Sequence, residues 1–125
     1  MEIVYDTGAL LAAERRERTM QLYHTKSLTQ GFVPLVPFVV LAQAWRGGPQ
    51  AELSRVLRGC DREPMTETTA REAGLACALA GTSDIVDAVV VVTAAKRGAL
   101  VVTSDPGDLS KIAEAIGAPL RLRTI

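Results

Sequence analysis

The sequence of 125 residues contains no apolar run that approaches the roughly 18 residues of a membrane-spanning helix. Its first residues also lack the basic segment, apolar stretch and cleavage site of a secretory signal. We therefore expect a cytoplasmic protein that does not enter a membrane. Hydrophobic residues make up 48% of the chain, which is long enough to bury a core. We expect one globular domain over residues 1 to 125.

Sulfur and nitrogen ligands for metals are scarce. The chain has two cysteines, Cys60 and Cys77, without CxxC spacing, and one histidine, His24. This set is too small for a typical zinc site. We expect both cysteines to be free thiols rather than partners in a disulfide.

Net charge is absent as well, because the 14 basic and 14 acidic residues cancel. No overall electric field therefore predicts a nucleic-acid partner. Arginines do cluster locally, at residues 15 to 18 and again at residues 46 to 62. Such clusters form either a solvated helix face or a patch that contacts a nucleic-acid backbone. The candidates for backbone contacts are Arg15, Arg16 and Arg46.

Short apolar runs alternate with helical segments, and this alternation is typical of an α/β fold. Pro34 restricts the second run to a sheet edge or to a strand end. Pro37 then opens a helix at its first position. The expected strands are residues 2 to 5, 32 to 36, 99 to 102 and 119 to 123, with room for a short strand in residues 60 to 65. The expected helices are residues 9 to 15, 19 to 29, 38 to 46, 50 to 58, 70 to 80, 84 to 97 and 111 to 116.

Residues 88 to 95 allow two interpretations. The four valines at 89 to 92 favour a strand by propensity, and that strand would form a hairpin with residues 99 to 102. A helix from Asp84 to Arg97 would instead complete a strand, helix, strand unit. The alternating order of the whole chain favours the helix.

Aspartates stand at the ends of the expected strands. Asp6 follows the first strand, and Asp105 follows the strand at residues 99 to 102. Asp84 and Asp87 are three residues apart, so both project from one face of the first turn of a helix that begins there. Open α/β sheets bind ligands at the carboxyl ends of their strands. In a parallel sheet we therefore expect the aspartates at 6, 87 and 105 to meet at one edge.

A cluster of this kind needs a counter-ion. Two unit charges about 4 Å apart repel by roughly 1 kcal/mol in water and by roughly 4 kcal/mol at an effective dielectric of about 20. Three such pairs approach the whole stability of a domain, about 5 to 15 kcal/mol. Oxygen ligands without histidine or thiolate select hard ions, so Mg²⁺ or Mn²⁺ is the expected cofactor. Such an ion can activate water for phosphodiester hydrolysis.

Each aspartate also has a purely structural interpretation. Asp6 is an acceptable helix cap, and Asp84 can cap a helix that has Asp87 at its third position. Asp105 precedes a Pro-Gly pair and has the chemistry of a turn residue. Each signal is weak alone, and only their joint placement at strand ends favours a metal site.

Four blocks of sequence, spread over nearly the whole chain, form a more specific combination. They are VYDTGALL at residues 4 to 11, VP at 36 and 37 with VLAQAWR at 40 to 46, SDIVDA at 83 to 88, and VVTSD at 101 to 105. Together they resemble a PIN domain, and most of all the VapC toxins of bacterial toxin-antitoxin pairs. The resemblance implies a three-layer α/β/α fold around a mainly parallel central sheet. It also implies a Mg²⁺-dependent endoribonuclease, a homodimer, and an antitoxin protein whose tail covers the site.

The resemblance carries roles to individual positions. Asp6, Asp87 and Asp105 match the metal-binding acids of the family, and Asp84 is an additional catalytic acid. The implied reaction is in-line attack of a metal-activated water on an RNA phosphodiester. The supporting residues are Thr7, Gln43 and Thr103, with Asp84 or Gln43 positioning water or a second ion.

One position departs from the family pattern, because Gln43 stands where the family usually has glutamate. An amide oxygen can still orient water or touch a metal ion, but the lost negative charge would weaken metal binding. Asp84 is placed to supply that charge. The alternative function is therefore a PIN-like scaffold that binds RNA or a protein partner without cleaving.

Two other phosphoryl-transfer classes also place aspartate at the end of the first strand. Haloacid dehalogenases need a second aspartate two residues later, where this chain has Gly8. Receiver domains need an acidic pair near the first strand and a late lysine at a strand end, and neither is evident. The sequence thus favours the nuclease over both.

Overall fold

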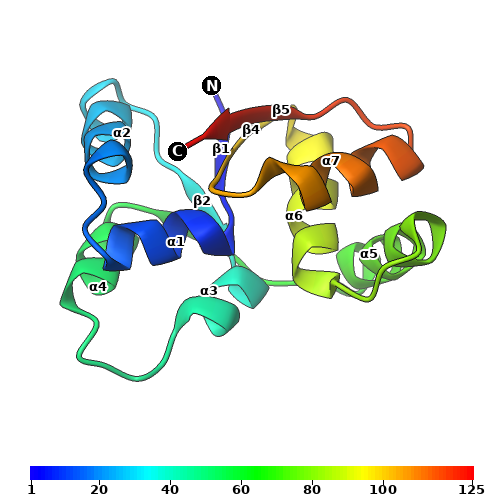
Figure 1. Ribbon diagram of the computed structural model, residues 1–125, viewed down its shortest axis with the longest axis horizontal. Coiled ribbons are helices and arrows are strands. Elements are labelled where there is room, and N and C mark those ends of the chain that lie inside the picture. The colour runs from blue at the N-terminus through cyan, green and yellow to red at the C-terminus, as the bar shows by residue number, and fades with distance from the viewer.

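The computed structural model describes all 125 residues, and its centre is a five-stranded sheet in the order β3-β2-β1-β4-β5 (Figure 1). Every neighbouring pair of strands is parallel. The mainly parallel α/β sheet expected from the sequence is therefore confirmed. The strands are β1 (Ile3–Tyr5), β2 (Leu35–Pro37), β3 (Asp61–Glu63), β4 (Leu100–Thr103) and β5 (Arg121–Thr124).

Seven helices cover the sheet. Helices α1, α2 and α4 group on one side of the sheet, and α5, α6 and α7 group on the other, which gives the expected three layers (Figure 1). The helices are α1 (Thr7–Glu14), α2 (Arg18–Thr29), α3 (Phe38–Ala44), α4 (Ala51–Arg58), α5 (Glu67–Ala80), α6 (Ile85–Arg97) and α7 (Pro106–Ala115).

The strand β1 lies at the middle of the sheet, and its register fixes the position of the candidate site. Tyr5, its last residue, pairs with Val102 of β4. The next backbone N–H, that of Asp6, donates to the Val102 carbonyl at 3.3 Å. The β1–α1 turn therefore lies beside the β4–α7 turn, at the carboxyl edge of the sheet.

The valine-rich segment is helical, as the alternating order predicted. Asp84 caps α6 by accepting a hydrogen bond from the Asp87 N–H at 3.0 Å, and Gly98 ends the helix with a left-handed φ of 61°. Every residue from Ala88 to Ala94 is buried between the sheet and the neighbouring helices. Burial on all sides outweighs the strand propensity of consecutive valines, because propensity is a weak term beside tertiary packing.

Some element boundaries differ from expectation. The last helix begins at Pro106, five residues earlier than predicted, because Asp105 adopts an extended cap conformation and proline is favoured at the first helical position. The second strand begins at Leu35, so Pro34 precedes it, and β2 is an interior strand. The short strand allowed in residues 60 to 65 is β3.

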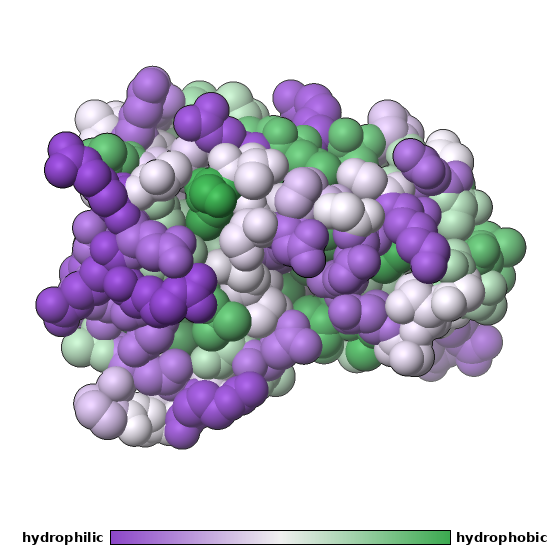
Figure 2. Space-filling view, in the orientation of Figure 1, coloured by the Kyte–Doolittle hydropathy of each residue, from purple (hydrophilic) through white to green (hydrophobic).

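Aliphatic side chains from both faces of the sheet form one continuous core. Cys60 and Cys77 are buried and free, as expected. No single helix has both the length and the apolarity to cross a membrane; only α5 and α6 taken together reach them, and those two helices meet at a bend of 112°. Figure 2 shows a strongly hydrophilic surface over α1 and α4 and hydrophobic residues over α5 at the opposite end.

Candidate functional site

Asp6 links the central strand to α1. Its Oδ1 accepts a hydrogen bond from the Ala9 N–H at 2.8 Å, so the structural interpretation of this residue as a helix cap is correct. The residue is only 6% exposed. Burial raises the pKa of the Asp6 carboxyl, hydrogen bonds from Thr103 and Ala9 lower it, and the negative charge of Asp105 raises it further. Asp6 is thus a partly desolvated carboxylate that already experiences a like charge.

Asp105 occupies the equivalent turn after β4. It is the cap residue of α7, yet its carboxylate makes no capping hydrogen bond. Its backbone N–H instead donates to the Thr103 Oγ1 at 3.0 Å, and its side chain is exposed. The backbone therefore makes the turn, and the carboxylate is left free for another role.

Asp87 lies on the first turn of α6 and is half-buried. Burial raises its pKa from 3.8 to about 7, and the next contributions come from the charge of Asp84 and a hydrogen bond with it. Asp6 and Asp108 raise the pKa further, in that order. Asp87 therefore experiences the charges of carboxylates at three other positions, and its pKa lies near neutral pH.

These interactions place the expected acids at one edge of the sheet. Asp6 experiences the charge of Asp105, and Asp87 experiences the charges of Asp6 and Asp84. Their side chains do not converge on one point, since no group of three or more histidine, cysteine, aspartate or glutamate residues is placed to hold a metal ion. The acids lie near one another, but they do not by themselves form a complete set of metal ligands.

The donor chemistry of this neighbourhood fits a hard divalent cation. The groups that could bind a cation there are carboxylate, hydroxyl or amide oxygens, which suit Mg²⁺ or Mn²⁺, and Lys111 is the one cationic side chain among their neighbours. Mg²⁺ commonly keeps several waters and takes only one or two carboxylates directly. The raised pKa of Asp87 also fits, because crowded carboxylates lose their mutual repulsion when a cation enters. We conclude that the residues present suit such an ion, with waters completing its coordination.

Thr7 and Gln43 join two helices beside Asp6. The Thr7 Oγ1 donates to the Gln43 Oε1 at 2.6 Å, although the residues are 36 positions apart. Gln43 is exposed on α3, so its amide NH₂ remains open to solvent. Thr7 therefore orients Gln43, whereas Thr103, which is fully buried, supports the acids directly.

Gly8 allows the two turns to approach each other. A Cβ at this position would lie 2.3 Å from the Ser104 Oγ and 3.3 Å from the Ser104 backbone nitrogen. Any larger residue would push α1 away from the turn that carries Asp105. Gly8, which stands where a haloacid dehalogenase would have its second aspartate, thus has a packing role at the candidate site.

Two neighbours of the acids were not assigned to the site from the sequence. Asp108 and Lys111, on the first turns of α7, line a cavity of about 80 Å³ together with Asp84 and Asp87. In the sequence, Asp108 is one of four acids that flank residues 81 to 109, and its place after Pro-Gly is also typical of a turn. Asp108 lies three residues after Asp105, which places both on one face of a helix that begins at Pro106. That placement could be inferred from the sequence only if the start of α7 were known.

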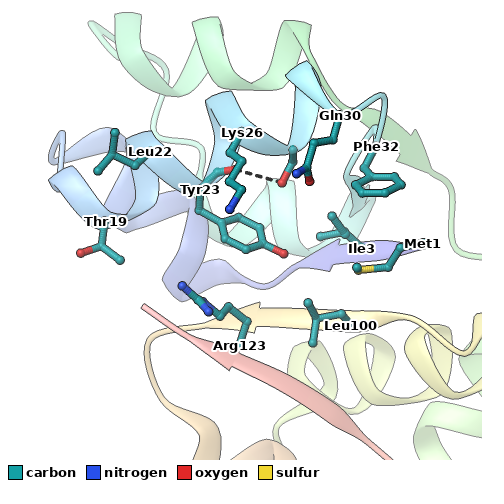
Figure 3. Close-up of a pocket in the computed structure, with 11 residues that line it drawn as sticks. Met1, Ile3, Thr19, Leu22, Tyr23, Lys26, Gln30, Phe32, Leu100 and Arg123 are labelled. Carbon is teal, nitrogen blue, oxygen red and sulfur yellow. Dashed lines mark hydrogen bonds between the residues drawn. The ribbon is translucent and has the colours of Figure 1, made fainter.

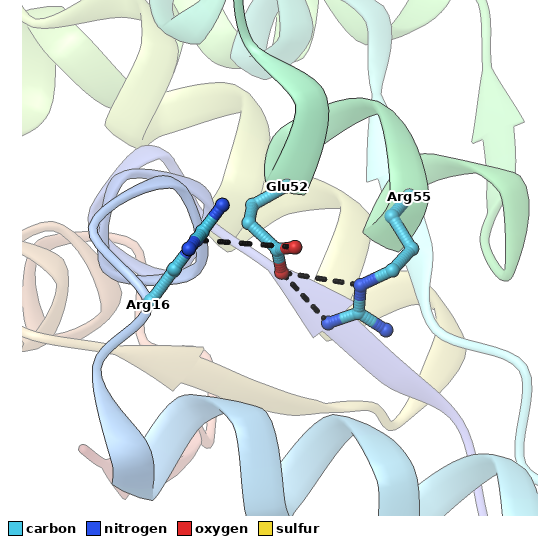
Figure 4. Close-up of polar contacts among 3 residues, drawn as sticks. All are labelled: Arg16, Glu52 and Arg55. Atoms are coloured by element: carbon cyan, nitrogen blue, oxygen red, sulfur yellow. Dashed lines mark hydrogen bonds and ion pairs between the residues drawn. The ribbon is translucent and has the colours of Figure 1, made fainter.

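Two of the three candidate RNA-binding arginines lie at the far end of α1 from the acids. Arg15 and Arg16 follow the carboxyl end of α1, a helix about 12 Å long, while Asp6 caps its amino end. Arg15 pairs with Glu17 at 3.1 Å. Arg16 lies 3.9 Å from Glu52, which also binds Arg55 at 3.0 Å (Figure 4). The third, Arg46, donates from its Nη1 to the Trp45 carbonyl at 2.7 Å.

A separate cavity of about 430 Å³ lies between α2 and the start of the sheet. Figure 3 shows Tyr23 and Lys26 of α2 over it, with Ile3 and Leu100 of the sheet and Arg123 of β5 on its other side. No acidic residue lines this cavity. It is therefore distinct from the candidate site.

Comparison with known proteins was informative only at the level of structure. No protein-family model matches the sequence, and no curated protein matches it either. A chain in the crystal structure of VapBC2 from Rickettsia felis bound to a DNA fragment from its promoter has a TM-score of 0.73, with 14% identity over 100% of this chain and 99% of that one.

Two further structures agree. A chain of DNA-bound VapBC from Salmonella typhimurium has a TM-score of 0.70 and 14% identity, over 99% of this chain and 98% of that one. PAE2754 from Pyrobaculum aerophilum has a TM-score of 0.61 and 15% identity, over 96% of this chain and 89% of that one. The protein therefore has the fold of the VapBC and PAE2754 structures over essentially its whole length, and the fold implied by the resemblance to PIN domains is confirmed.

Proposed function

We propose that this protein is a Mg²⁺-dependent endoribonuclease and the toxin of a type II toxin-antitoxin pair. The observation that carries the proposal is the crowding of aspartates at the carboxyl edge of the sheet. Burial raises the pKa of Asp87 to about 7, with further contributions from the charges of Asp84 and Asp6, and Asp6 in turn experiences the charge of Asp105. The same edge is the general ligand site of open parallel sheets. The fold match to VapBC structures supports the same function.

The roles of the residues follow from their environments. Asp6, Asp87 and Asp105 would hold the ion, and the bound ion would supply charge neutralisation and an activated water. Asp6 is the most constrained ligand. Its Oδ1 accepts the capping hydrogen bond of α1, and this bond also fixes the position of its other carboxylate oxygen. Thr103 donates a hydrogen bond to the Asp6 carboxylate and accepts one from the Asp105 N–H, which limits the movement of both residues. Gln43, oriented by Thr7, presents its amide NH₂ to a phosphate oxygen or to the attacking water.

Asp84 is assigned the charge that Gln43 does not provide. Its Oδ1 is used in capping α6, and its carboxylate faces Asp87. We predict that Asp84→Asn lowers Mg²⁺ affinity nearly as much as Asp87→Asn, measured by isothermal titration calorimetry. An asparagine still accepts the capping hydrogen bond, so the comparison isolates the charge. An unchanged Mg²⁺ affinity in Asp84→Asn would contradict this role.

A protein antitoxin and a homodimer belong to the same proposal. Leu75 and Leu79 on α5 are 61% and 58% exposed, and Ile85 at the start of α6 is 41% exposed. Large apolar side chains gathered on one face favour an interface. We assign this face to the second copy of the chain, and cytoplasmic localisation stays a prediction.

The direct test is cleavage of single-stranded RNA by the purified protein. We expect cleavage with Mg²⁺ or Mn²⁺, none with EDTA, and recovery when the metal is restored. RNA binding without cleavage at any metal concentration would favour the alternative, a non-cleaving scaffold. Gln43 and the absence of a closed ligand cage are the two observations that favour that alternative.

A further inference from the structure

Helices α3 and α4 enclose a groove of about 560 Å³ that sequence analysis did not identify. We call it the α3–α4 groove. Its α3 wall is made by residues spaced three and four apart, which places them on one face of that helix. The residues on which the argument rests are Phe38, Leu41, Trp45, Leu57, Arg58 and Arg62.

Two aromatic rings at the groove are open to solvent. Phe38 is 45% exposed and Trp45 is 41% exposed, although both are large apolar side chains. They stand seven residues apart, two helical turns, so their rings lie along the same side of the groove. Leu41 and Leu57 are more buried and form its floor. The groove therefore offers flat apolar faces beside a shallow apolar floor.

The only charged residues that line the groove are arginines. Arg58 and Arg62 form no ion pair, and no carboxylate lines the groove. Arg62 donates one hydrogen bond, from its Nη1 to the Leu57 carbonyl at 3.2 Å, and keeps its other donors. Arg55, on the same helix, differs because Glu52 holds it at 3.0 Å. The positive charge of the groove is thus unneutralised.

The α3–α4 groove adjoins the candidate nuclease site through one helix. Gln43, which bonds Thr7 beside Asp6, lies on the opposite side of α3 from Phe38 and Trp45. A helix is about 10 Å across with its side chains. A flexible chain that passes over α3 could therefore occupy the groove and reach the acids at the same time.

We propose that the α3–α4 groove binds single-stranded RNA, with bases stacked on Trp45 and Phe38 and phosphates held by Arg58 and Arg62. Aromatic faces beside unpaired cations are the chemistry that binds unpaired nucleotides without sequence preference. Guanidinium groups both contact phosphate and stack on rings. A duplex cannot expose its bases to these rings. This inference rests on the proposed function and names the form of RNA that the site receives.

Trp45 is the only tryptophan in the chain, so its fluorescence reports on the groove directly. We would titrate the full-length protein, in EDTA to prevent cleavage, with a 12-residue oligouridylate, the same length of duplex RNA, and an acidic polyglutamate peptide. We expect the single strand to quench Trp45 and the duplex to bind more weakly. The affinity should fall as salt rises, because phosphate contacts release counterions.

Variants separate the two parts of the groove, with binding measured by anisotropy of labelled oligouridylate. Trp45→Ala should weaken binding by roughly 5- to 150-fold, the usual range for one stacked base, and Trp45→Phe should retain most of it. The Arg58→Ala, Arg62→Ala double variant should reduce the salt slope by about 1.4, the value for two phosphates on a single strand. Arg71→Ala on α5 is the matched control, because Arg71 is exposed and lies on the other side of the sheet.

Several outcomes would overturn the groove assignment. They are an unquenched Trp45 at saturating RNA, unchanged RNA affinity in the double arginine variant, equal affinity for the duplex, or tighter binding of the acidic peptide. The last would assign the groove to a protein partner. Unfolding of Trp45→Ala would not interfere, since the exposed arginine variants test the same site. Mg²⁺-dependent cleavage that persists in these cases would leave the nuclease proposal intact.

Discussion

The molecule contains two clusters of charge that are built in opposite ways. At the carboxyl edge of the sheet, Asp6 experiences the like charge of Asp105, and Asp87 experiences the like charges of Asp84 and Asp6. On the α1–α4 side, Glu52 lies between Arg16 at 3.9 Å and Arg55 at 3.0 Å, as Figure 4 shows. None of the aspartates of the first cluster forms an ion pair, although Lys111 lines the cavity beside Asp87, whereas the second cluster neutralises itself.

The two clusters differ in whether their charges stabilise the native state. An exposed pair such as Glu52–Arg55 contributes at most about 1 kcal/mol and needs no ligand. Buried and crowded carboxylates instead oppose folding, and one of them, Asp87, binds a proton more tightly because of its burial first and the charges of Asp84 and Asp6 second. A cluster that the chain keeps despite its cost is a better candidate for function than one that stabilises the fold.

The strongest test of the comparison is removal of single charges from the acid cluster. We expect Asp105→Asn to reduce RNA cleavage by more than about 100-fold, since even outer-shell partners of a metal cost about 10- to 100-fold. Its stability should not change, because the carboxylate makes no capping bond. Asp61→Asn, an exposed acid on the edge strand β3, is the control and should cleave RNA normally. Cleavage that survives Asp105→Asn would remove this residue from the metal site.

The next largest effect is on the pH dependence of stability in the metal-free protein. Folding raises the pKa of Asp87 to about 7. The protonated form therefore stabilises the native state below about pH 4, and this stabilisation is lost as the pH rises to 7 and beyond. The loss should be about 1 to 2 kcal/mol after allowance for solvent screening of this half-exposed group.

Urea denaturation at pH 4.5 and at pH 8 measures this loss. Asp87→Asn should be less sensitive to pH than the unmodified protein over that interval, and Mg²⁺ should restore part of the stability that the unmodified protein loses. An identical pH dependence in the two proteins would show that folding does not raise the pKa of Asp87.

A smaller effect is expected when charge is added to the acid cluster. Gln43→Glu supplies the carboxylate that the family pattern has at this position and still accepts the Thr7 hydrogen bond. We expect Mg²⁺ affinity to rise by about 5- to 10-fold, corresponding to roughly 1 kcal/mol for one exposed charge near the ion. Calorimetric titration with Mg²⁺ measures it. Unchanged affinity would show that Gln43 lies outside the coordination sphere.

The smallest effect should come from the self-neutralised cluster. Glu52→Gln removes the partner of Arg16 and Arg55, and we expect a loss of less than about 1 kcal/mol that disappears in high salt. RNA cleavage should be unchanged. Thermal denaturation in low and high salt checks the stability. A large loss of activity would show that the two clusters are coupled.

Much of the fold could be predicted from the sequence because its signals are local. Asp84 caps the helix expected from residue 84 through its side-chain chemistry, and Gly98 ends that helix after Arg97, where the end was expected, through its left-handed backbone. The start of α7 was wrong because a cap at Asp105 looks identical in sequence to a turn before Pro-Gly. Only the packing of the helix against α5 and α6 decides between them.

The candidate site could be predicted only in part. Acids at strand ends are visible in sequence because parallel strands bring their carboxyl ends together. Asp108 and Lys111 were not assigned to the site because their position depends on where α7 begins. The α3–α4 groove was missed because it depends on the packing of two separate helices, and Trp45 alone in sequence resembles a core residue.

Asp6 performs two tasks with one carboxylate, since one oxygen closes the first turn of α1 and the whole group would face the ion. Losing this side chain would lower stability by about 0.5 to 2 kcal/mol through the lost cap as well as remove a metal ligand, whereas the Asp105 carboxylate makes no cap that could be lost. A descendant of this chain that gave up catalysis should therefore retain its first aspartate longest. The presence of that residue in a related sequence would then say little about activity, and the residue after β4 would be the one to inspect.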